Sequence, residues 1–92
     1  DVNRSAKRWG EAEEAYRQGL RISREIRDKV REAWRLSDLG LLEEDRQQWD
    51  EALEWYGQAL DIFEALNQPA NRIVIWSNIG RVNRPAKRWG EA

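Results

Sequence analysis

The chain has 92 residues, 36% of them charged, with a net charge of −1 and neither Cys nor His. This length allows one small domain, and the lack of Cys excludes disulfides and thiolate chemistry. The near-neutral balance gives no general attraction to nucleic acid or anionic lipid, and no apolar run approaches the roughly 20 residues of a membrane-spanning helix. We therefore expect a cytoplasmic protein with no nucleic-acid or membrane partner.

The sequence contains an internal repeat with a period of 40 residues. Residues 2–12 and 82–92 agree at ten of eleven positions, and residues 9–22 and 49–62 are identical at eight of fourteen. A fixed period of this length is typical of arrays of helix pairs. We interpret residues 1–92 as a single array that holds two units and a twelve-residue overlap.

Four helices and a helical stub are predicted in chain order. Apolar residues recur at spacings of three and four, most clearly at Trp49, Ala52, Leu53, Tyr56, Ala59, Leu60, Phe63 and Leu66, which puts them on one helix face. Asp28 fits the position before a helix, and Pro69 and Pro85 each fit a first helical position. The sequence therefore predicts helices over roughly 7–27, 29–45, 49–67 and 70–84, and a stub over 86–92.

A helix pair of this kind cannot cover its own apolar face, and it buries that face by stacking on the next pair. We therefore expect an all-α solenoid, in which small residues let helices approach and aromatic rings fill the space beside them. The predicted core consists of Trp9, Tyr16, Leu39, Gly40, Trp49, Ala52, Tyr56, Ala59, Leu60, Trp76, Ile79, Gly80 and Trp89.

One set of residues recurs in a fixed order: Leu36, Leu39-Gly40, Trp49, Ala52, Tyr56 and Ala59-Leu60, preceded by Ala12, Tyr16 and Leu20 and followed by Trp76, Ile79-Gly80, Trp89 and Ala92. This pattern resembles the tetratricopeptide repeat over essentially the whole chain, above all the variety with repeats of roughly 40 residues. The resemblance implies a right-handed superhelical solenoid of antiparallel helix hairpins that binds a protein or peptide. The sequence departs from the family pattern at Gly19, Glu43 and Asn83.

In the family that this chain resembles, the first helix of each pair lines a concave groove. Mapped onto this sequence, the groove would present Trp34, Ser37, Asp38, Leu41 and Glu44 from one pair, and Val74, Ser77, Asn78, Arg81 and Arg84 from the next. Asn78 matches an Asn that often holds the backbone of an extended peptide through its amide. Its counterpart Asp38 cannot donate when ionised, and the Lys residues of the family's carboxylate clamp have no match here.

Residues for catalysis are scarce. The chain has no His and no Thr, and none of its four Ser lies in a nucleophile motif. A glycine-rich phosphate loop is also missing. The acidic run Glu43-Glu44-Asp45 lacks the spacing and the Gly of a calcium loop, so a solvated helix end explains it better. We expect no enzyme activity, no cofactor and no metal site.

Two interpretations stay open for the tryptophans that break the repeat period. Trp34 and Trp55 have no Trp at the equivalent positions. Exposed Trp is a favoured interface anchor, so each is either a partner contact or packed on an adjacent repeat.

A second hypothesis for function is structural. Because residues 2–12 and 82–92 are nearly the same, the end of one molecule could take the place of its neighbour's start. The result would be a homo-oligomer formed by head-to-tail stacking. The chain also begins without Met, so we equally expect a fragment or an engineered piece of a longer array.

Overall fold

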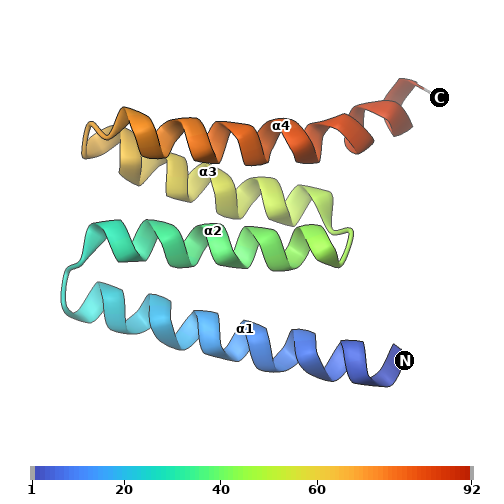
Figure 1. Cartoon of the computed structure of the whole chain (residues 1–92), viewed down its shortest axis with the longest axis horizontal. Coiled ribbons are helices and arrows are strands. Elements are labelled where there is room, and N and C mark those ends of the chain that lie inside the picture. Colours follow the sequence, from blue (N-terminus) through green and yellow to red (C-terminus); the bar gives the residue numbers. More distant parts are fainter. Residues whose placement is uncertain (1, 92) are drawn as a thin grey trace.

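The structure is a stack of four antiparallel helices. The computed structural model describes the backbone of residues 2–91 and the side chains of residues 8–84. Figure 1 shows the helices in chain order, namely α1 (Val2–Glu25), α2 (Lys29–Asp45), α3 (Trp49–Ala65) and α4 (Pro69–Glu91). No strand occurs within residues 2–91. In the described part of the chain, no helix combines the length and the apolar content that crossing a membrane requires.

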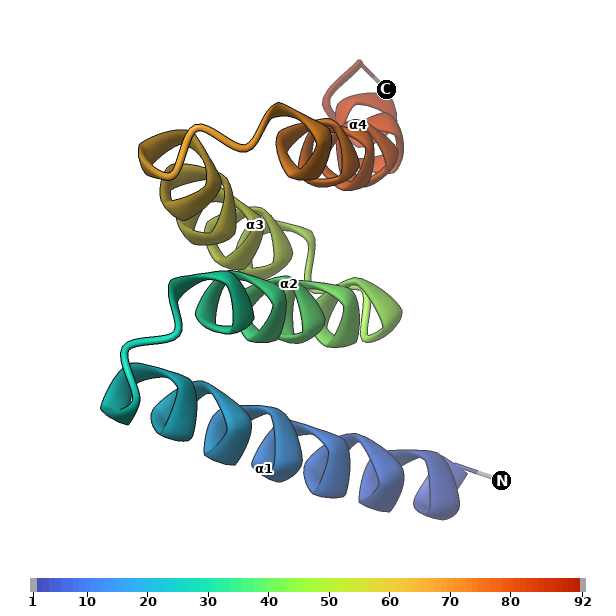
Figure 2. The same ribbon diagram turned by 60° about the vertical axis from the view of Figure 1, so that its left-hand side comes forward.

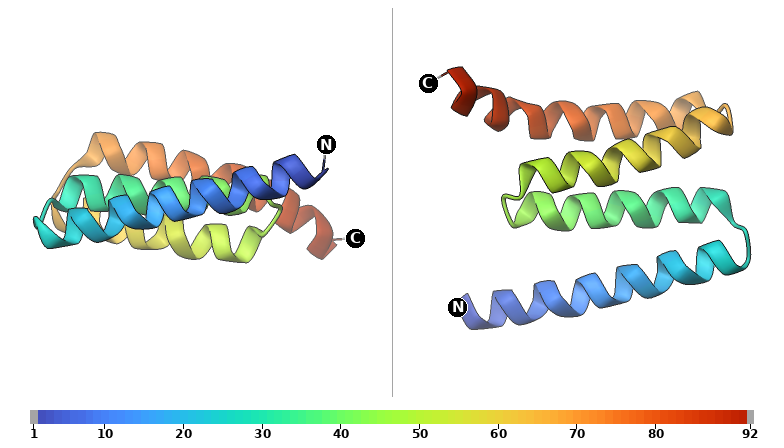
Figure 3. Two further views of the ribbon diagram at one scale, coloured as in Figure 1. Left: turned by 90° about the horizontal axis from the view of Figure 1, so that it is seen from below. Right: turned by 180° about the vertical axis from the view of Figure 1, so that it is seen from behind.

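Helices that are neighbours in sequence are also neighbours in space. α1 packs on α2, α2 on α3, and α3 on α4. Figure 2 shows them following one another in staggered steps, so that α1 and α4 are the two outer helices. The N-terminal end of α1 and the C-terminal end of α4 lie at the same side of the stack (Figure 3). The two outer helices are therefore antiparallel to each other as well.

The helix bounds differ from the prediction at both ends of the chain. α1 begins five residues and ends two residues earlier than the predicted 7–27. α2 has the predicted bounds, and α3 ends two residues earlier than predicted. α4 runs without a break from Pro69 to Glu91, where the sequence predicted an end at 84 and a stub from 86. Pro85 is therefore inside a helix and not at its start. Proline removes one hydrogen bond there and bends the helix without ending it, and Figure 1 shows α4 changing direction near its C-terminal end.

The three turns between the helices have the same geometry. Arg27, Gln47 and Asn67 adopt positive φ angles of 58°, 61° and 56°. In the first turn, the Arg27 N–H donates to the Arg24 carbonyl at 3.2 Å and the Asp28 N–H donates to the Ser23 carbonyl at 2.9 Å. The same pair of hydrogen bonds recurs in the other two turns. This is the Schellman motif, which satisfies the last carbonyls of a helix and reverses the chain within a few residues.

The core lies mainly between α2 and α3. The fully or nearly fully buried apolar side chains are Leu20, Ala33, Leu36, Leu39, Leu42, Ala52, Tyr56, Ala59, Leu60, Phe63, Ile75 and Val82. At its centre the Tyr56 ring lies directly on the backbone of Gly40, where an added Cβ atom would lie 2.6 Å from the Cε1 atom of Tyr56. Only a residue without a side chain fits this close approach, so Gly40 determines how near α2 and α3 lie.

Several residues of the predicted core are not buried. Trp76 is 54% exposed, and no described atom of a neighbouring element lies within 4 Å of a Cβ atom added at Gly80. The physical reason is that α4 has only one packed side, which holds the buried Ile75 and Val82. The predicted core residues Trp9, Tyr16, Trp49 and Ile79 are half-buried. The Trp89 side chain lies outside the described residues.

Candidate functional site

A three-residue network joins the helices that carry the predicted groove. Glu44 at the C-terminal end of α2 accepts a hydrogen bond from the Tyr56 hydroxyl at 2.8 Å. It also forms an ion pair with Arg81 of α4, whose Nη2 atom lies 2.8 Å from Glu44 Oε1. Glu44 and Arg81 come from helices that have α3 between them in the chain. The network therefore links the C-terminal end of α2 to α4 across α3.

The electrostatics of the network favour the charged form of both partners of the ion pair. The hydrogen bond from Arg81 lowers the pKa of Glu44 below its usual range, and the hydrogen bond to Glu44 raises the pKa of Arg81. Burial, followed by the neighbouring Glu44 carboxylate, raises the pKa of Tyr56. At neutral pH the network thus consists of a carboxylate, a guanidinium and a neutral phenol.

Replacing Glu44 with Gln is expected to lower the free energy of unfolding at pH 7 by about 1–2 kcal/mol, because hydrogen bonds to a charged group are weakened. The folded-state pKa of Glu44 is below its unfolded value of about 4.5. Its stabilisation is therefore complete above that pH and is lost as the pH falls through the lowered pKa. Urea unfolding from neutral pH to acid should show the wild-type and variant curves converging.

Asp38 supplies a control, because its pKa is shifted in the opposite direction to that of Glu44. Burial raises the pKa of Asp38, and the nearby Arg35 lowers it by less. The contribution of this carboxyl is present at low pH and is lost as the pH rises through the raised pKa. Asp38→Asn should therefore not destabilise the chain at pH 7 in the same experiment. A loss in Glu44→Gln that stays constant down to acid pH would contradict the ion-pair explanation.

The structure places the predicted groove residues in different environments. Leu41 and Val74 are 40% and 43% exposed. Ser77, Arg81 and Arg84 are exposed, and Asn78 is half-buried. The half-buried Asp38 forms an ion pair with Arg35 at 3.2 Å.

Two residues of the predicted groove are buried or half-buried within the chain itself. Ser37 is 3% exposed and lies within the helix packing. The Trp34 ring packs edge-to-face on Phe63, with 5.0 Å between ring centroids, and is half-buried. Trp34 therefore packs on the second helix of its own pair, which is neither the partner contact nor the packing on an adjacent repeat that the sequence left open.

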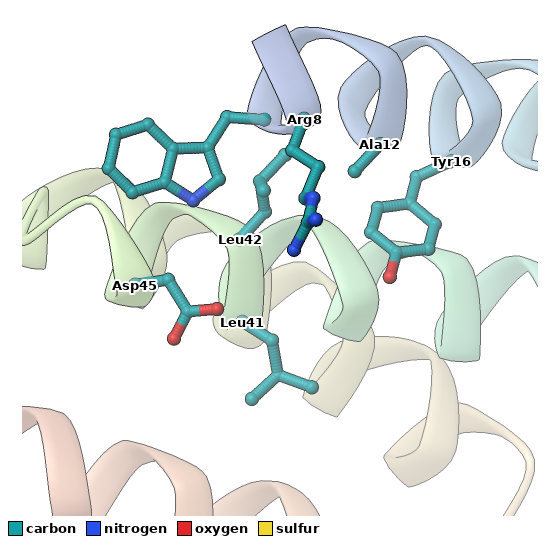
Figure 4. Close-up of a pocket in the computed structure, with 7 residues that line it drawn as sticks. Arg8, Ala12, Tyr16, Leu41, Leu42 and Asp45 are labelled. Carbon is teal, nitrogen blue, oxygen red and sulfur yellow. The ribbon is translucent and has the colours of Figure 1, made fainter. Parts of the chain in front are cut away.

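Sequence reasoning missed a pocket between α1 and α2. It has a volume of about 480 Å³ and is lined by Arg8, Trp9, Ala12, Tyr16, Leu41, Leu42 and Asp45. Figure 4 shows the side chains of α1 and α2 approaching this space from two sides. Of these residues only Leu41 belongs to the predicted groove. The repeat contained a signal for this pocket. Tyr16 and Leu41 stand 40 positions before Tyr56 and Arg81, and those two later residues contact Glu44 of α2.

The comparison with protein families agrees with this architecture. The family model described as tetratricopeptide repeat matches residues 1–65, which is more than half of the chain and covers α1, α2 and α3. No curated protein and no solved structure matches the chain. The family match and the stack of antiparallel helices confirm the expected all-α helical repeat solenoid. The chain belongs to the tetratricopeptide repeat family.

Proposed function

We propose that residues 1–92 form one repeat array that binds a polypeptide segment on the surface shared by α2 and α4. Tetratricopeptide repeats are protein-interaction scaffolds and are typically non-catalytic. The observation that carries the proposal is the ion pair between Glu44 and Arg81, which joins the two helices on one side of α3. Exposed apolar and cationic side chains lie on the same two helices, namely Leu41, Val74 and Arg84.

The chemistry of this surface suits a peptide that carries both apolar and acidic side chains. Val74 and Leu41 offer exposed apolar area that a partner can cover. Arg84 offers a guanidinium, which binds carboxylates with two parallel hydrogen bonds. Arg81 is already paired with Glu44, so Arg84 is the better placed of these two cations to meet a partner.

A phage-displayed library of random peptides is a suitable probe, because it samples many apolar and acidic sequences at once. Peptides selected on the wild-type chain are expected to lose about tenfold or more in affinity for Val74→Asp, because an interface anchor is worth roughly 1–2 kcal/mol. A smaller loss is expected for Asn78→Ala. Isothermal titration of the selected peptides against each variant measures both effects.

The matched control is Ile26→Ser. Ile26 is an exposed apolar residue that follows α1 and is not part of the surface on α2 and α4. Its replacement should leave peptide affinity unchanged. Equal affinity of the wild type, Val74→Asp and Asn78→Ala for every selected peptide would remove this surface as the binding site.

A second candidate function is self-association into a structural assembly. The specific observation that favours it is the exposure of Ile73 and Trp76, 66% and 54%, on an outer helix. Large apolar side chains grouped on one exposed face mark interaction sites. Because the repeats are nearly equivalent, a second copy of this chain is a natural partner for that face.

A further inference from the structure

The exposed side of α4 has a buried counterpart within the same molecule. Ile73, Trp76, Ser77 and Gly80 lie three or four positions apart, so they form one stripe along α4, and all four are exposed. The residues 40 positions earlier on α2, which are Ala33, Leu36, Ser37 and Gly40, are all buried. Because Gly40 contacts Tyr56, the stripe on α2 faces α3. By this equivalence, the exposed stripe on α4 is expected to pack against a helix that resembles α3.

α1 is the helix of this chain that resembles α3. Residues 9–22 and 49–62 share eight of fourteen positions. Their common residues include Trp9 and Tyr16 of α1, which line the pocket between α1 and α2. The third lining residue from this part of α1, Ala12, also has an identical counterpart in α3.

The pocket lies on α1 and α2, and the equivalent place on α3 and α4, 40 residues later, is filled by α2. Shifted by 40 residues, its lining residues Tyr16 and Leu41 become Tyr56 and Arg81. Those two residues are contacted by α2 itself, through Gly40 and Glu44. The helix equivalent to α2 at the next repeat is α4, so the segment that matches this pocket by sequence is α4.

From these two correspondences we infer that α4 of one copy docks into the pocket between α1 and α2 of a second copy. Gly80 lies against the Tyr16 ring of the second copy, as Gly40 lies against Tyr56. Among the side chains of residues 8–84 and the other helices, nothing lies within 4 Å of a Cβ atom added at Gly80, so the surface is open to an incoming ring. The inference rests on the second proposed function, self-association, and assigns its contact residues.

Charge complementarity supports the same alignment. Arg84 stands 40 positions after Glu44, whose partner Arg81 corresponds to Leu41 of the pocket. Asp45 of the second copy lies one helical turn after Leu41 and also lines the pocket. In the docked copies Arg84 reaches the Asp45 carboxylate, one helical turn beyond the point that corresponds to the contact of Glu44 with Arg81. Arg8 also lines the pocket and carries the same charge as Arg84. Its side chain is long and exposed, so it can turn toward solvent when α4 enters.

The predicted contact is weaker than its counterpart inside the chain. Trp34 and Phe63, which pack edge-to-face between α2 and α3, are replaced by Val74 and Ser23 at the equivalent positions. The two copies therefore lose an aromatic pair and associate reversibly. Because α1 and α4 lie on opposite sides of the stack (Figure 1), each docked copy still presents one free outer helix, and the assembly is open-ended.

Light scattering across a concentration series tests the inference. The average mass of the wild-type chain should rise with concentration. Gly80→Leu should weaken association about tenfold or more, because a side chain at this position overlaps the incoming Tyr16 ring. The variant should keep the helical content of the dilute wild type and be at least as heat-stable, since its new side chain meets open space in the free chain and Leu has a higher helix propensity than Gly.

Charge reversal tests the alignment without changing the core. Arg84→Asp and Asp45→Arg, both at exposed positions, should each weaken association about two- to fivefold, with a smaller effect at high salt. Mixing the two variants restores an opposite-charge pair between copies and should recover association. A structural defect in either variant would not be repaired by mixing.

The outcomes separate the inference from the proposed function on which it rests. A monomeric mass for the wild type at every concentration overturns both self-association and the assigned contact. A mass that rises equally in the wild type, Gly80→Leu and the charge-reversal variants leaves self-association standing and overturns docking of α4 into this pocket. Weaker association of each charge-reversal variant alone, with recovery of association in their mixture, supports the assigned contact.

Discussion

Truncating Tyr56 to Ala is expected to lower the free energy of unfolding by about 3–5 kcal/mol, more than any other single substitution proposed for this chain. The ring is 0% exposed, contacts the backbone of Gly40, and carries the hydroxyl that donates to Glu44. Removing it leaves a cavity between α2 and α3. For a chain of this size the total stability is roughly 5–14 kcal/mol, so a large part of it depends on this one residue.

Urea unfolding followed by circular dichroism measures this loss of stability. Two further variants separate the contribution of the hydroxyl from that of the ring, and the buried Tyr from its half-buried counterpart. Tyr56→Phe keeps the ring and removes only the hydroxyl, so about 1 kcal/mol should be lost. Tyr16→Ala changes the equivalent residue of α1, whose ring is only half-buried, and should cost clearly less than Tyr56→Ala. Equal losses at Tyr16 and Tyr56 would show that the core does not lie where the structure has it.

Adding a single methyl group at two equivalent glycines is expected to change stability in opposite directions. At Gly40 the new Cβ atom would lie 2.6 Å from a ring carbon of Tyr56, and the separation of α2 and α3 would cost about 1–3 kcal/mol. At Gly80 the new atom meets open space, and the higher helix propensity of Ala should raise stability by up to about 1 kcal/mol.

Thermal unfolding of dilute Gly40→Ala and Gly80→Ala reads out the difference, because each kcal/mol shifts the melting temperature by about 4–8 °C in a domain of this size. The pair is well matched, since both residues occupy the same position of the repeat, 40 residues apart. A fall in melting temperature for both variants would mean that the exposed face of α4 is covered even in dilute solution.

The repeat in the sequence was sufficient to predict the helices and the residues that are equivalent to one another. It predicted α2 to the residue and the small residue at position 40 that faces an aromatic ring. It failed at Trp76 and Gly80, because equivalence in sequence does not imply equal burial. A residue is buried only where a neighbouring helix lies on it, and in this structure α3 has such a neighbour on both sides while α4 does not.

The candidate site was less accessible from the sequence than the fold. The link between Glu44 and Arg81 crosses 37 residues and depends on the distance between α2 and α4 after α3 has packed between them. Charge alone could not identify that pair among 16 basic and 17 acidic residues. Trp34 was ambiguous for a similar reason, since its orientation toward Phe63 depends on how α2 and α3 cross.

The three left-handed turn residues have a consequence for how this protein could be made more heat-resistant. Arg27, Gln47 and Asn67 are spaced 20 residues apart, and none of them is Gly. A left-handed backbone costs Arg27 and Gln47 about 1–2 kcal/mol that Gly avoids, whereas Asn tolerates this conformation more readily. Stability can therefore be raised at the Arg27 turn, by changing a residue that belongs to neither proposed interaction surface.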